Sequence, residues 1–546
     1  MRRFSIVIIV AFIALMSVAQ EVRPTKNLIV MIPDGTSISV LSAARWLKVY
    51  RNEGTKLHVD PYISGTVTTF SSNAPIGDSA PTTSTFMTGI PQQAANVSIY
   101  PEADPKNDLV KIDPDSAYQP LVTILEAMQM EQNKAAGLVV TCEFPHATPA
   151  DCAAHYYARS NYAAIAPQMA FNNLSVMFGG GNEFVSDAMK QHFKNTGTAY
   201  IQNDKNAMLN YSGEKVWALF KDQAMSYDLD RNPDEEPSLA EMTEKALEVL
   251  NKNKNGFFLM VEGSKVDWSA HANDPAGIIG EFLAFDEAVG KAIEFAKKDG
   301  NTTVVILPDH GNSGFSIGRR GLKKSYARLT LEDLFEGISK IKLTSVGLEK
   351  ILLETKPENF KSVFYQHTGI QLNDDELKSL LSSKNYKSGD YPKTSESKNM
   401  GHYIAEIYNS KTGFGYTTDG HTGEEVFLAV YHPQGDILKG NVRNTELHNY
   451  LYKVSGLKTS MYEHTGNTFA KHTDVFRGMN YQIVNTIGKT PKLVVKFKKH
   501  TLEIPAFSSV ATINGKLLDL GSVAVFIDKN NTFYLPKNLK ERVFGQ

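Results

Sequence analysis

Residues 302–311, "TTVVILPDHG", form a short apolar run that ends in an aspartate and a histidine. The length and β-branched content of this run are typical of a strand buried on both faces, as in a parallel sheet covered by helices. Three more segments share the design: "NLIVMIPDG" (27–35), "AAGLVVTCEFPHAT" (135–148) and "GFFLMVEGSKVD" (256–267). Helical patterns lie between them, for instance at 118–133, 239–253 and 279–300. This alternation predicts an α/β fold, a three-layer α/β/α sandwich with a mostly parallel central sheet.

Two regions depart from this alternation. Residues 315–405 contain charged helical stretches without a buried-strand pattern, so we expect an inserted helical region near the active site, after which the sheet resumes at 424–433. Residues 486–546 alternate apolar and polar side chains, and Asn514-Gly515 is typical of a hairpin turn. We therefore expect a catalytic domain over 20–485 and a small C-terminal β-rich appendage over 486–546.

The N-terminus has the pattern of a signal peptide. Arg2 and Arg3 precede the apolar run "FSIVIIVAFIALMSV", and small residues follow at Ser17 and Ala19. The run is shorter than the roughly 20 residues that a membrane-spanning helix needs. We therefore expect residues 1–19 to be cleaved, which predicts a periplasmic or secreted protein without a membrane anchor.

The composition is that of an ordinary globular chain, with 42% hydrophobic and 21% charged residues. The formal net charge of -2 provides no general basic field, so we expect no nucleic-acid partner. Cys142 and Cys152 could form one disulfide or remain buried thiols, and we favour two buried, inert thiols.

Polar side chains follow three of the expected strands. Asp34, Glu262, and the pair Asp309 and His310 lie at the carboxyl ends, where ligands bind in open sheets of this kind. A single acid at a strand end is often a turn residue or a helix cap. Four such side chains at one edge favour a functional site.

Residues with metal-ligand chemistry add to this group. In "VDWSAH" (266–271), Asp267 and His271 are four residues apart, so a helical turn presents both on one face. His421 stands in the glycine-flanked loop "DGHTG". Carboxylates and imidazoles in these numbers suit two or three divalent ions. His464 repeats the "HTG" wording, but only His421 directly precedes an apolar strand, so we expect His464 to be a surface or insertion residue.

The order and local wording of these motifs resemble the alkaline phosphatases over roughly residues 27–480. The matching motifs are "PDG" with Asp34, "DSA" with Ser79, "HATPA" with Thr148, "HYYARSNY" with Arg159, "VEGSKVDWSAH" with Glu262, Asp267 and His271, "DHG" with Asp309 and His310, and "GHTGEEV" with His421. The resemblance implies hydrolysis of small-molecule phosphate monoesters to alcohol and phosphate through a phosphoserine on Ser79. It also implies a homodimer.

Three metal sites follow from the resemblance. One Zn²⁺ would be held by Asp267, His271 and His421. A second Zn²⁺ would be held by Asp34, Asp309 and His310, with the Ser79 oxygen beside it. A third ion, Mg²⁺ in many members, would use Asp34, Glu262 and Thr148. Arg159 would bind two phosphoryl oxygens through its guanidinium fork.

The expected nucleophile lies in "GDSAPTTSTFMTG" (77–89), which contains six hydroxyl groups that local chemistry alone does not rank. With the resemblance, Ser79 stands out because it follows Asp78 at the start of a helix whose first turn includes Pro81, where the helix dipole favours an anionic phosphoryl group. Thr82, Thr83, Ser84 and Thr85 would then only pack within that helix.

Two positions depart from the commonest bacterial pattern. His146 and Trp268 replace an aspartate and a lysine beside the third metal site, a combination within the range of the family. Histidine favours zinc or cobalt over magnesium, so we expect a weakened magnesium preference there. A diesterase, a sulfatase and a binding protein without turnover are the alternatives. The absence of a sulfatase C/S-x-P-x-R motif and the presence of Arg159 and Glu262 favour the monoesterase.

Overall fold

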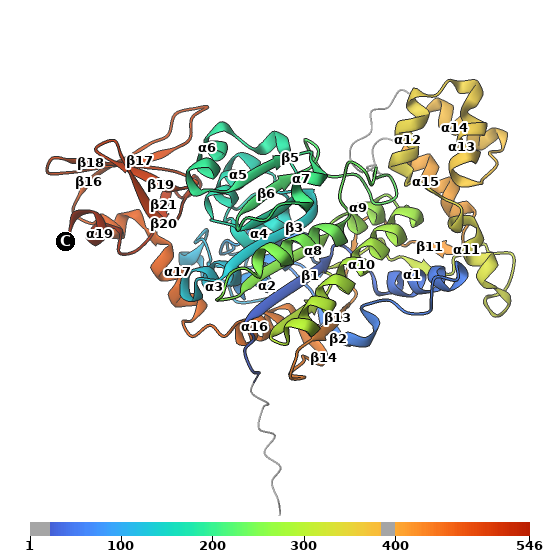
Figure 1. Cartoon of the computed structure of the whole chain (residues 1–546), viewed down its shortest axis with the longest axis horizontal. Helices are drawn as coiled ribbons and strands as arrows, with labels where there is room; N and C mark the ends of the chain where they lie inside the picture. Colours follow the sequence, from blue (N-terminus) through green and yellow to red (C-terminus); the bar gives the residue numbers. More distant parts are fainter. Residues whose placement is uncertain (1–21, 384–398, 546) are drawn as a thin grey trace, which may run out of the picture.

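The computed structural model describes residues 22–383 and 399–545 (Figure 1). The expected signal peptide over residues 1–19 lies outside the described residues. Within the described part of the chain, no helix combines the length and the apolar character needed to cross a membrane.

A ten-stranded sheet forms the centre of the molecule. Its strands, in spatial order, are β14 (Gly440–Arg443), β2 (Ile63–Thr68), β13 (Val426–Tyr431), β8 (Thr302–Ile306), β1 (Asn27–Pro33), β7 (Phe257–Gly263), β3 (Ala135–Glu143), β4 (Val176–Gly180), β6 (Val216–Leu219) and β5 (Ala199–Gln202). Among these strands only β13 runs antiparallel to its two neighbours. The expected mostly parallel sheet is thereby confirmed.

Both faces of this sheet are buried, as the continuous apolar runs predict. Leu28, Val30 and Ile32 of β1 belong to one hydrophobic cluster, whereas Ile29 and Met31 belong to another on the opposite face. The first cluster includes residues of α2 (Ser79–Thr88), α3 (Ile124–Gln132), α4 (Ala147–Ala153) and α16 (Asn444–Ser455). The second includes residues of α1 (Ile38–Tyr50), α8 (Leu239–Leu250) and α10 (Pro275–Asp299). The fold is therefore the predicted α/β/α sandwich.

The insertion between β8 and β13 is helical, as expected. Its helices are α11 (Leu331–Ser339), α12 (Ser345–Glu354), α13 (Phe360–Thr368), α14 (Asp374–Ser382) and α15 (Met400–Ser410), and four of them gather at the upper right of Figure 1. The Ser345 amide donates to Asp274 (2.6 Å), and Asn409 Nδ2 donates to the Asn273 carbonyl (2.7 Å). The insertion is thus fixed to the turn that follows His271.

The C-terminal strands form a second, antiparallel sheet at the left of Figure 1. In spatial order it consists of β15 (Ala470–Lys471), β21 (Thr532–Leu535), β20 (Lys516–Ile527), β19 (Ser508–Ile513), β18 (His500–Pro505), β17 (Lys492–Phe497) and β16 (Asn480–Val484). Asn514 and Gly515 both have positive φ (50° and 77°), as the expected hairpin turn requires. The sheet begins before the predicted boundary at 486, because β16 completes it by pairing along its whole length with β17.

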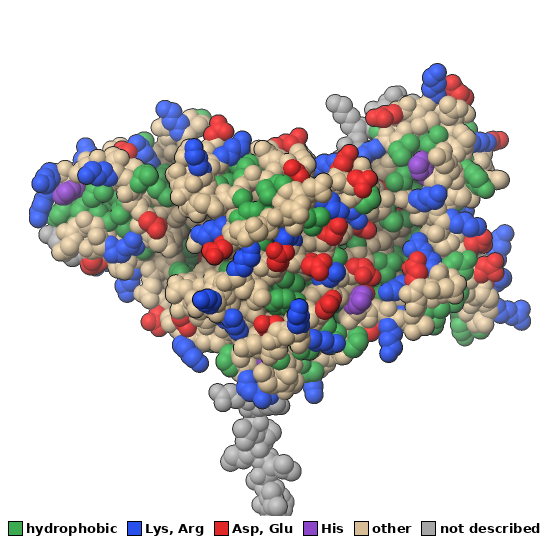
Figure 2. All heavy atoms as spheres, viewed as in Figure 1, with side chains coloured by type: hydrophobic (Ala, Val, Ile, Leu, Met, Phe, Trp, Pro, Cys, Tyr) green, Lys and Arg blue, Asp and Glu red, His purple; other side chains and the backbone are tan. Residues whose placement is uncertain are grey.

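Exposed lysines mark the outer end of this sheet. Lys496, Lys498 and Lys499 lie on β17 and the turn after it, and Figure 2 shows lysine and arginine side chains at this end of the molecule. The inward residues Leu493 and Val495 belong to the same hydrophobic cluster as α2 and α3. The appendage therefore packs on the catalytic body through a continuous apolar core.

Candidate active site

The predicted strand-end residues meet at one edge of the sheet. Asp34 directly follows β1, Glu262 lies in β7 opposite Ile32, and Asp309 and His310 follow β8. All four of these polar side chains have zero exposed surface. Parallel pairing of β1 with both β7 and β8 brings the carboxyl ends together, so residues far apart in sequence become neighbours.

A glycine allows the closest approach in this region. Gly35 has φ +59°, and a Cβ atom there would lie only 2.3 Å from Asp267 Oδ1. A side chain at this position would displace the carboxylate of the helix α9 (Lys265–His271). The loop after β1 therefore passes directly against α9.

Asp267, His271 and His421 form one candidate metal-binding group. Ligand atoms of the three residues lie within 4.8 Å of one another, and the Nε2 atoms of the two histidines are 3.1 Å apart. The helical spacing of Asp267 and His271 is the predicted one. His421 reaches them because β12 (His421–Thr422) pairs with β9 (Gly311–Asn312), the two residues that follow His310.

Asp34, Asp309 and His310 form a second group of the same kind. The His310 ring stacks on the His421 ring with centroids 3.8 Å apart, so the two groups adjoin each other. Ser79 Oγ lies 3.4 Å from both Asp34 Oδ2 and His310 Nε2. The structure thus brings together the six predicted zinc-site residues and the predicted nucleophile.

The position of Ser79 follows from the start of α2. Asp78 is the N-cap, and its carboxylate accepts the Ser79 backbone N–H at 2.9 Å. Thr82, Thr85 and Thr88 donate their hydroxyls to carbonyls four residues earlier in the chain, and all are buried. Of the six hydroxyls in this stretch, that of Ser79 contacts Asp34 and His310.

The three histidines share one arrangement that suits metal binding. The Nδ1 atoms of His271, His310 and His421 lie 2.7–3.1 Å from the main-chain carbonyls of Asp419, Gly311 and Gly77. A carbonyl only accepts hydrogen bonds, so Nδ1 carries the proton and the lone pair of Nε2 faces the carboxylates. Neutral imidazoles oriented in this way are the usual histidine ligands of metals in proteins.

The carboxylates carry strongly perturbed pKa values. Burial raises the pKa of Asp34 well above its ordinary value, and the adjacent Asp309 and Asp267 raise it further. Burial also raises the pKa of Glu262 to about 7. Burial opposes ionisation of Asp267 too, but His271 and His421 hold its pKa well below the usual range. So many buried acids are costly unless cations balance them, and the donor set fits divalent metals.

The predicted third site differs from expectation in its composition. Glu262 groups with His146 and Cys142, whose ligand atoms all lie within 4.8 Å of one another. Thr148 and Asp34 are both fully buried, and Thr148 Oγ1 has no hydrogen-bond partner among the described residues. Trp268 is also buried, and its ring lies 5.8 Å from that of His146. The sequence interpretation did not include Cys142 in this site.

Arg159 is linked to the nucleophile through Asp78. Its Nη1 donates to Asp78 Oδ1 at 2.7 Å, and Nη2 lies 3.3 Å from His146 Nε2. Burial works against ionisation of Asp78, yet Arg159 keeps the pKa of this acid below its ordinary value. The Arg159 side chain remains 24% exposed, so it can also reach a ligand from solvent.

A sequence profile of the family described as Alkaline phosphatase matches residues 25–457. The chain belongs to the alkaline phosphatase family. It is therefore a metal-dependent phosphatase that acts on small phosphate monoesters. Alkaline phosphatase 3 of Bacillus subtilis (strain 168) is 33% identical over 445 residues, which cover 79% of this chain and 88% of that relative.

Solved structures of alkaline phosphatases share the fold. The enzyme of Thermus thermophilus superposes with a TM-score of 0.69 at 21% identity, covering 81% of this chain and 94% of that one. A histidine-to-glutamate variant of the alkaline phosphatase from the Antarctic bacterium TAB5 gives a TM-score of 0.54 at 23% identity, covering 80% of this chain and 100% of that one. The latter structure holds Mg in its M3 site.

The sequence interpretation of this alkaline phosphatase family member misplaced His464 and missed the contacts of Asp78 and Asn312. His464 does not join the groups; it bonds Glu131 (3.1 Å) and is 8% exposed, so the expected surface position is wrong. Asp78 was not assigned the contact with Arg159, although an aspartate before a helical Ser-Ala-Pro is a recognisable N-cap. Asn312 donates to Asp267 Oδ1 at 2.7 Å, and no sequence signal indicates this contact.

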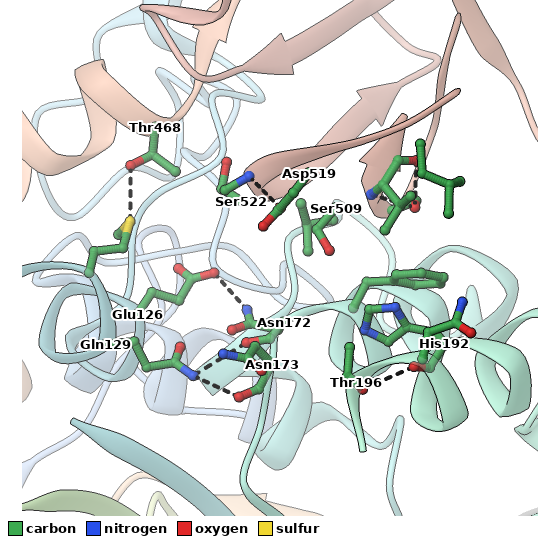
Figure 3. A pocket seen from close by; sticks show the side chains of 18 of the residues that line it. Glu126, Gln129, Asn172, Asn173, His192, Thr196, Thr468, Ser509, Asp519 and Ser522 are labelled. Atoms are coloured by element: carbon green, nitrogen blue, oxygen red, sulfur yellow. Dashed lines mark hydrogen bonds between the residues drawn. The ribbon is translucent and has the colours of Figure 1, made fainter. Parts of the chain in front are cut away.

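The phosphatase also has a wide cleft away from these groups. About 730 Å³ in volume, it lies between α3, α5 (Tyr162–Phe171), α6 (Asp187–Thr196) and the β19–β20 hairpin. Figure 3 shows amides and hydroxyls lining it, including Gln129, Asn172, Asn173 and Ser509. Its described lining includes none of the predicted site residues. The cleft is therefore separate from the candidate metal-binding groups at the sheet edge.

Proposed function

We propose that the chain hydrolyses phosphate monoesters by transferring the phosphoryl group to Ser79 and then to water. The observation that carries this proposal is the position of Ser79 Oγ, 3.4 Å from both Asp34 and His310 at the first residue of a helix. In the first step the Ser79 Oγ–P bond forms, the ester P–O bond breaks and the alcohol leaves. In the second step water cleaves the phosphoserine and releases phosphate.

The residues fit three ions. Two Zn²⁺ would be held by Asp267, His271 and His421 and by Asp34, Asp309 and His310, whose Nε2 atoms and buried carboxylates are suitable donors. A third divalent ion would lie at Glu262. Bound zinc lowers the pKa of a coordinated hydroxyl or water and balances negative charge. The Mg bound by the TAB5 variant supports a divalent ion at the third position.

Arg159 and α2 would bind the phosphoryl group. Arg159 has five N–H donors, and its contacts with Asp78 and His146 leave donors for phosphoryl oxygens. Asp78 holds the guanidinium near Ser79, which orients the fork before substrate arrives. The N-terminal end of the α2 dipole stabilises the negative charge at Ser79.

Export and assembly belong to the same proposal. The N-terminal arginines and apolar run support secretion to the periplasm or the exterior. The homodimer stays a prediction.

The test compares an aryl phosphate monoester with its diester and its sulfate ester, with Zn²⁺ and Mg²⁺ supplied. We expect the monoester to be turned over fastest. Acid quenching during turnover should leave one phosphoryl group on wild type and none on Ser79→Ala, as read by intact-protein mass spectrometry. Ser509→Ala, in the cleft, is the matched control and should be phosphorylated like wild type. Faster diester turnover, or phosphorylation of Ser79→Ala, would contradict the proposal.

A further inference from the structure

Cys142 belongs to the hydrophobic core and also lies among potential metal ligands. Its Sγ is 3.5 Å from Glu262 Oε2, and both side chains have zero exposed surface. A ring nitrogen of His146 completes the group, with all three ligand atoms within 4.8 Å of one another. The group combines sulfur, nitrogen and oxygen donors, unlike the two histidine–carboxylate groups beside it.

Main-chain hydrogen bonds fix the cysteine in this position. Cys142 is the penultimate residue of β3, which pairs in parallel with β7, the strand that contains Glu262. The backbone N–H groups of Thr141 and Cys142 both donate to Ser264 Oγ, at 3.2 and 3.1 Å. The end of β3 is thereby tied to the turn between β7 and α9, and the thiol is held against Glu262.

Unpartnered polar atoms of Glu262, His146 and Thr148, which follows His146 by two residues, independently favour a cation-binding site. Glu262 Oε1, Thr148 Oγ1 and His146 Nδ1 are buried atoms without a hydrogen-bond partner among the described residues. Glu262 and Thr148 each have zero exposed surface. Buried polar atoms left unpaired are costly, and those in a native protein usually have a ligand or an ion as partner. Glu262 Oε1 and Thr148 Oγ1 can donate lone pairs to a metal, and so can one ring nitrogen of a neutral His146.

We propose that Cys142 is a ligand of the third metal site and that this site, with Cys142, His146 and Glu262 as ligands, takes zinc in preference to magnesium. This inference rests on the proposed three-metal function. Sulfur and imidazole donors select zinc, whereas magnesium demands six hard oxygen ligands in octahedral geometry. On binding, the metal–sulfur bond replaces the S–H bond, and the thiol proton leaves to solvent. Thr148 Oγ1 or a water can fill the fourth position of a tetrahedral zinc.

Cys152 provides a matched control within the same chain. It is equally buried, and its Sγ contacts the Thr148 carbonyl at 3.7 Å, but it belongs to no group of potential ligands among the described residues. The chain has two cysteines in all, so a zinc–thiolate bond has only two possible sources. Cys152 is the thiol that we expect to be inert.

X-ray absorption at the zinc edge tests the assignment on the full-length protein loaded with zinc. Wild type and Cys152→Ser should show sulfur scattering at about 2.3 Å, and Cys142→Ser should lack it. Dialysis against equal Zn²⁺ and Mg²⁺ followed by elemental analysis should show that Cys142→Ser loses third-site zinc at least about tenfold more readily. Wild type without zinc–sulfur scattering, or loss of scattering in Cys152→Ser alone, would overturn the proposal.

If Cys142→Ser fails to fold, Co²⁺ binding by wild type tests the same ligand. Wild type titrated with Co²⁺ should develop a thiolate-to-cobalt charge-transfer band, and its absence would also refute the ligand. Monoesterase activity measured on the same samples separates the two proposals. If wild type is active but has no metal–sulfur bond, only the proposed role of Cys142 is contradicted. If the metal–sulfur bond is present but the protein never forms phosphoserine, the catalytic proposal is contradicted instead.

Discussion

The sheet edge and the cleft in Figure 3 are both rich in polar side chains, but they differ in how those side chains are satisfied. At the edge, Asp309 Oδ2 and Glu262 Oε1 are buried without a hydrogen-bond partner among the described residues. In the cleft, Gln129 donates to two main-chain carbonyls, Asn172 donates to Glu126, and Asn173 accepts from Lys215. Buried carboxylate oxygens without a partner therefore distinguish the candidate metal-binding edge from the cleft, whose Gln129, Asn172 and Asn173 are hydrogen-bonded.

The largest contrast should come from the nucleophile. Ser79→Ala removes the only hydroxyl proposed to attack phosphorus, so kcat should fall at least about a thousandfold. Ser509→Ala alters a hydroxyl in the cleft and should leave kcat within about twofold of wild type. Steady-state hydrolysis of an aryl phosphate measures both. A comparable loss of kcat in the two variants would contradict the proposed difference between the sheet edge and the cleft.

Removal of divalent metals from the sheet edge should have the second-largest effect on activity. Without cations, burial and then the neighbouring acids disfavour ionisation of Asp34, so its pKa lies well above the ordinary value. Exhaustive chelation should abolish monoesterase activity and lower the free energy of unfolding by about 4 kcal/mol, if metal is normally present at about 1,000 times its Kd. Calorimetry before and after readdition of Zn²⁺ checks this. Unchanged stability would mean that the acids are balanced in another way.

Substitution of Arg159 should cause a smaller loss. Arg159→Ala removes charged hydrogen bonds to the phosphoryl group, each worth about 1.5–3 kcal/mol, so kcat/KM should fall about 10- to 100-fold. Arg159→Lys retains the charge without the fork and should recover only part of the loss. Inhibition by inorganic phosphate should weaken in parallel. If phosphate binds Arg159→Ala normally, Arg159 serves only to hold Asp78.

The metal-free protein should become less stable as pH rises. The pKa of Glu262 is about 7 when folded, against 4.5 in its ordinary state, so the folded chain keeps a proton that the unfolded chain loses. The contribution of Glu262 to the free energy of unfolding should therefore fall between about pH 4.5 and pH 7, by up to about 3 kcal/mol, and level off above. Thermal melts in chelator should show this fall. Glu262→Gln should flatten it, and an equal fall in that variant would assign it to another group.

Changes inside the cleft should have the smallest effect. Asn195 accepts a hydrogen bond from Gln191 at 2.8 Å on the exposed side of α6. Asn195→Ala should leave monoesterase kcat/KM within about twofold and the melting temperature within about 2 °C, since exposed substitutions of this kind are worth at most about 0.5 kcal/mol. Assays with the aryl phosphate and a thermal melt test this. A large loss of activity would link the cleft to catalysis.

Much of the sheet edge could be predicted from the sequence because its parts are local. Continuous apolar runs identify β1, β3, β7 and β8, and the polar residues after each run lie at the same edge in any parallel sheet. The i, i+4 spacing likewise placed Asp267 and His271 on one face of α9. The grouping of the eight ligand residues comes from the family resemblance, since spacing cannot reveal which strand end meets which loop.

Other parts depend on tertiary contacts that no local pattern encodes. β16 is a short strand of mixed exposure, so only its pairing with β17 reveals it and moves the start of the appendage. In the sequence, Cys142 looks like one more apolar residue of a buried strand. Its proximity to Glu262 arises because β3 pairs with β7. His464 has the same local wording as His421, but its partner Glu131 is 333 residues away.

The orientation of His271, His310 and His421 is set by carbonyl groups of residues 419, 311 and 77. Every amino acid supplies a carbonyl, so replacing the side chain at those positions does not delete the acceptor. Only a change in the path of the main chain could do so. Divergence in sequence therefore leaves this part of the site intact, whereas histidines oriented by carboxylate side chains can be disabled by a single codon change.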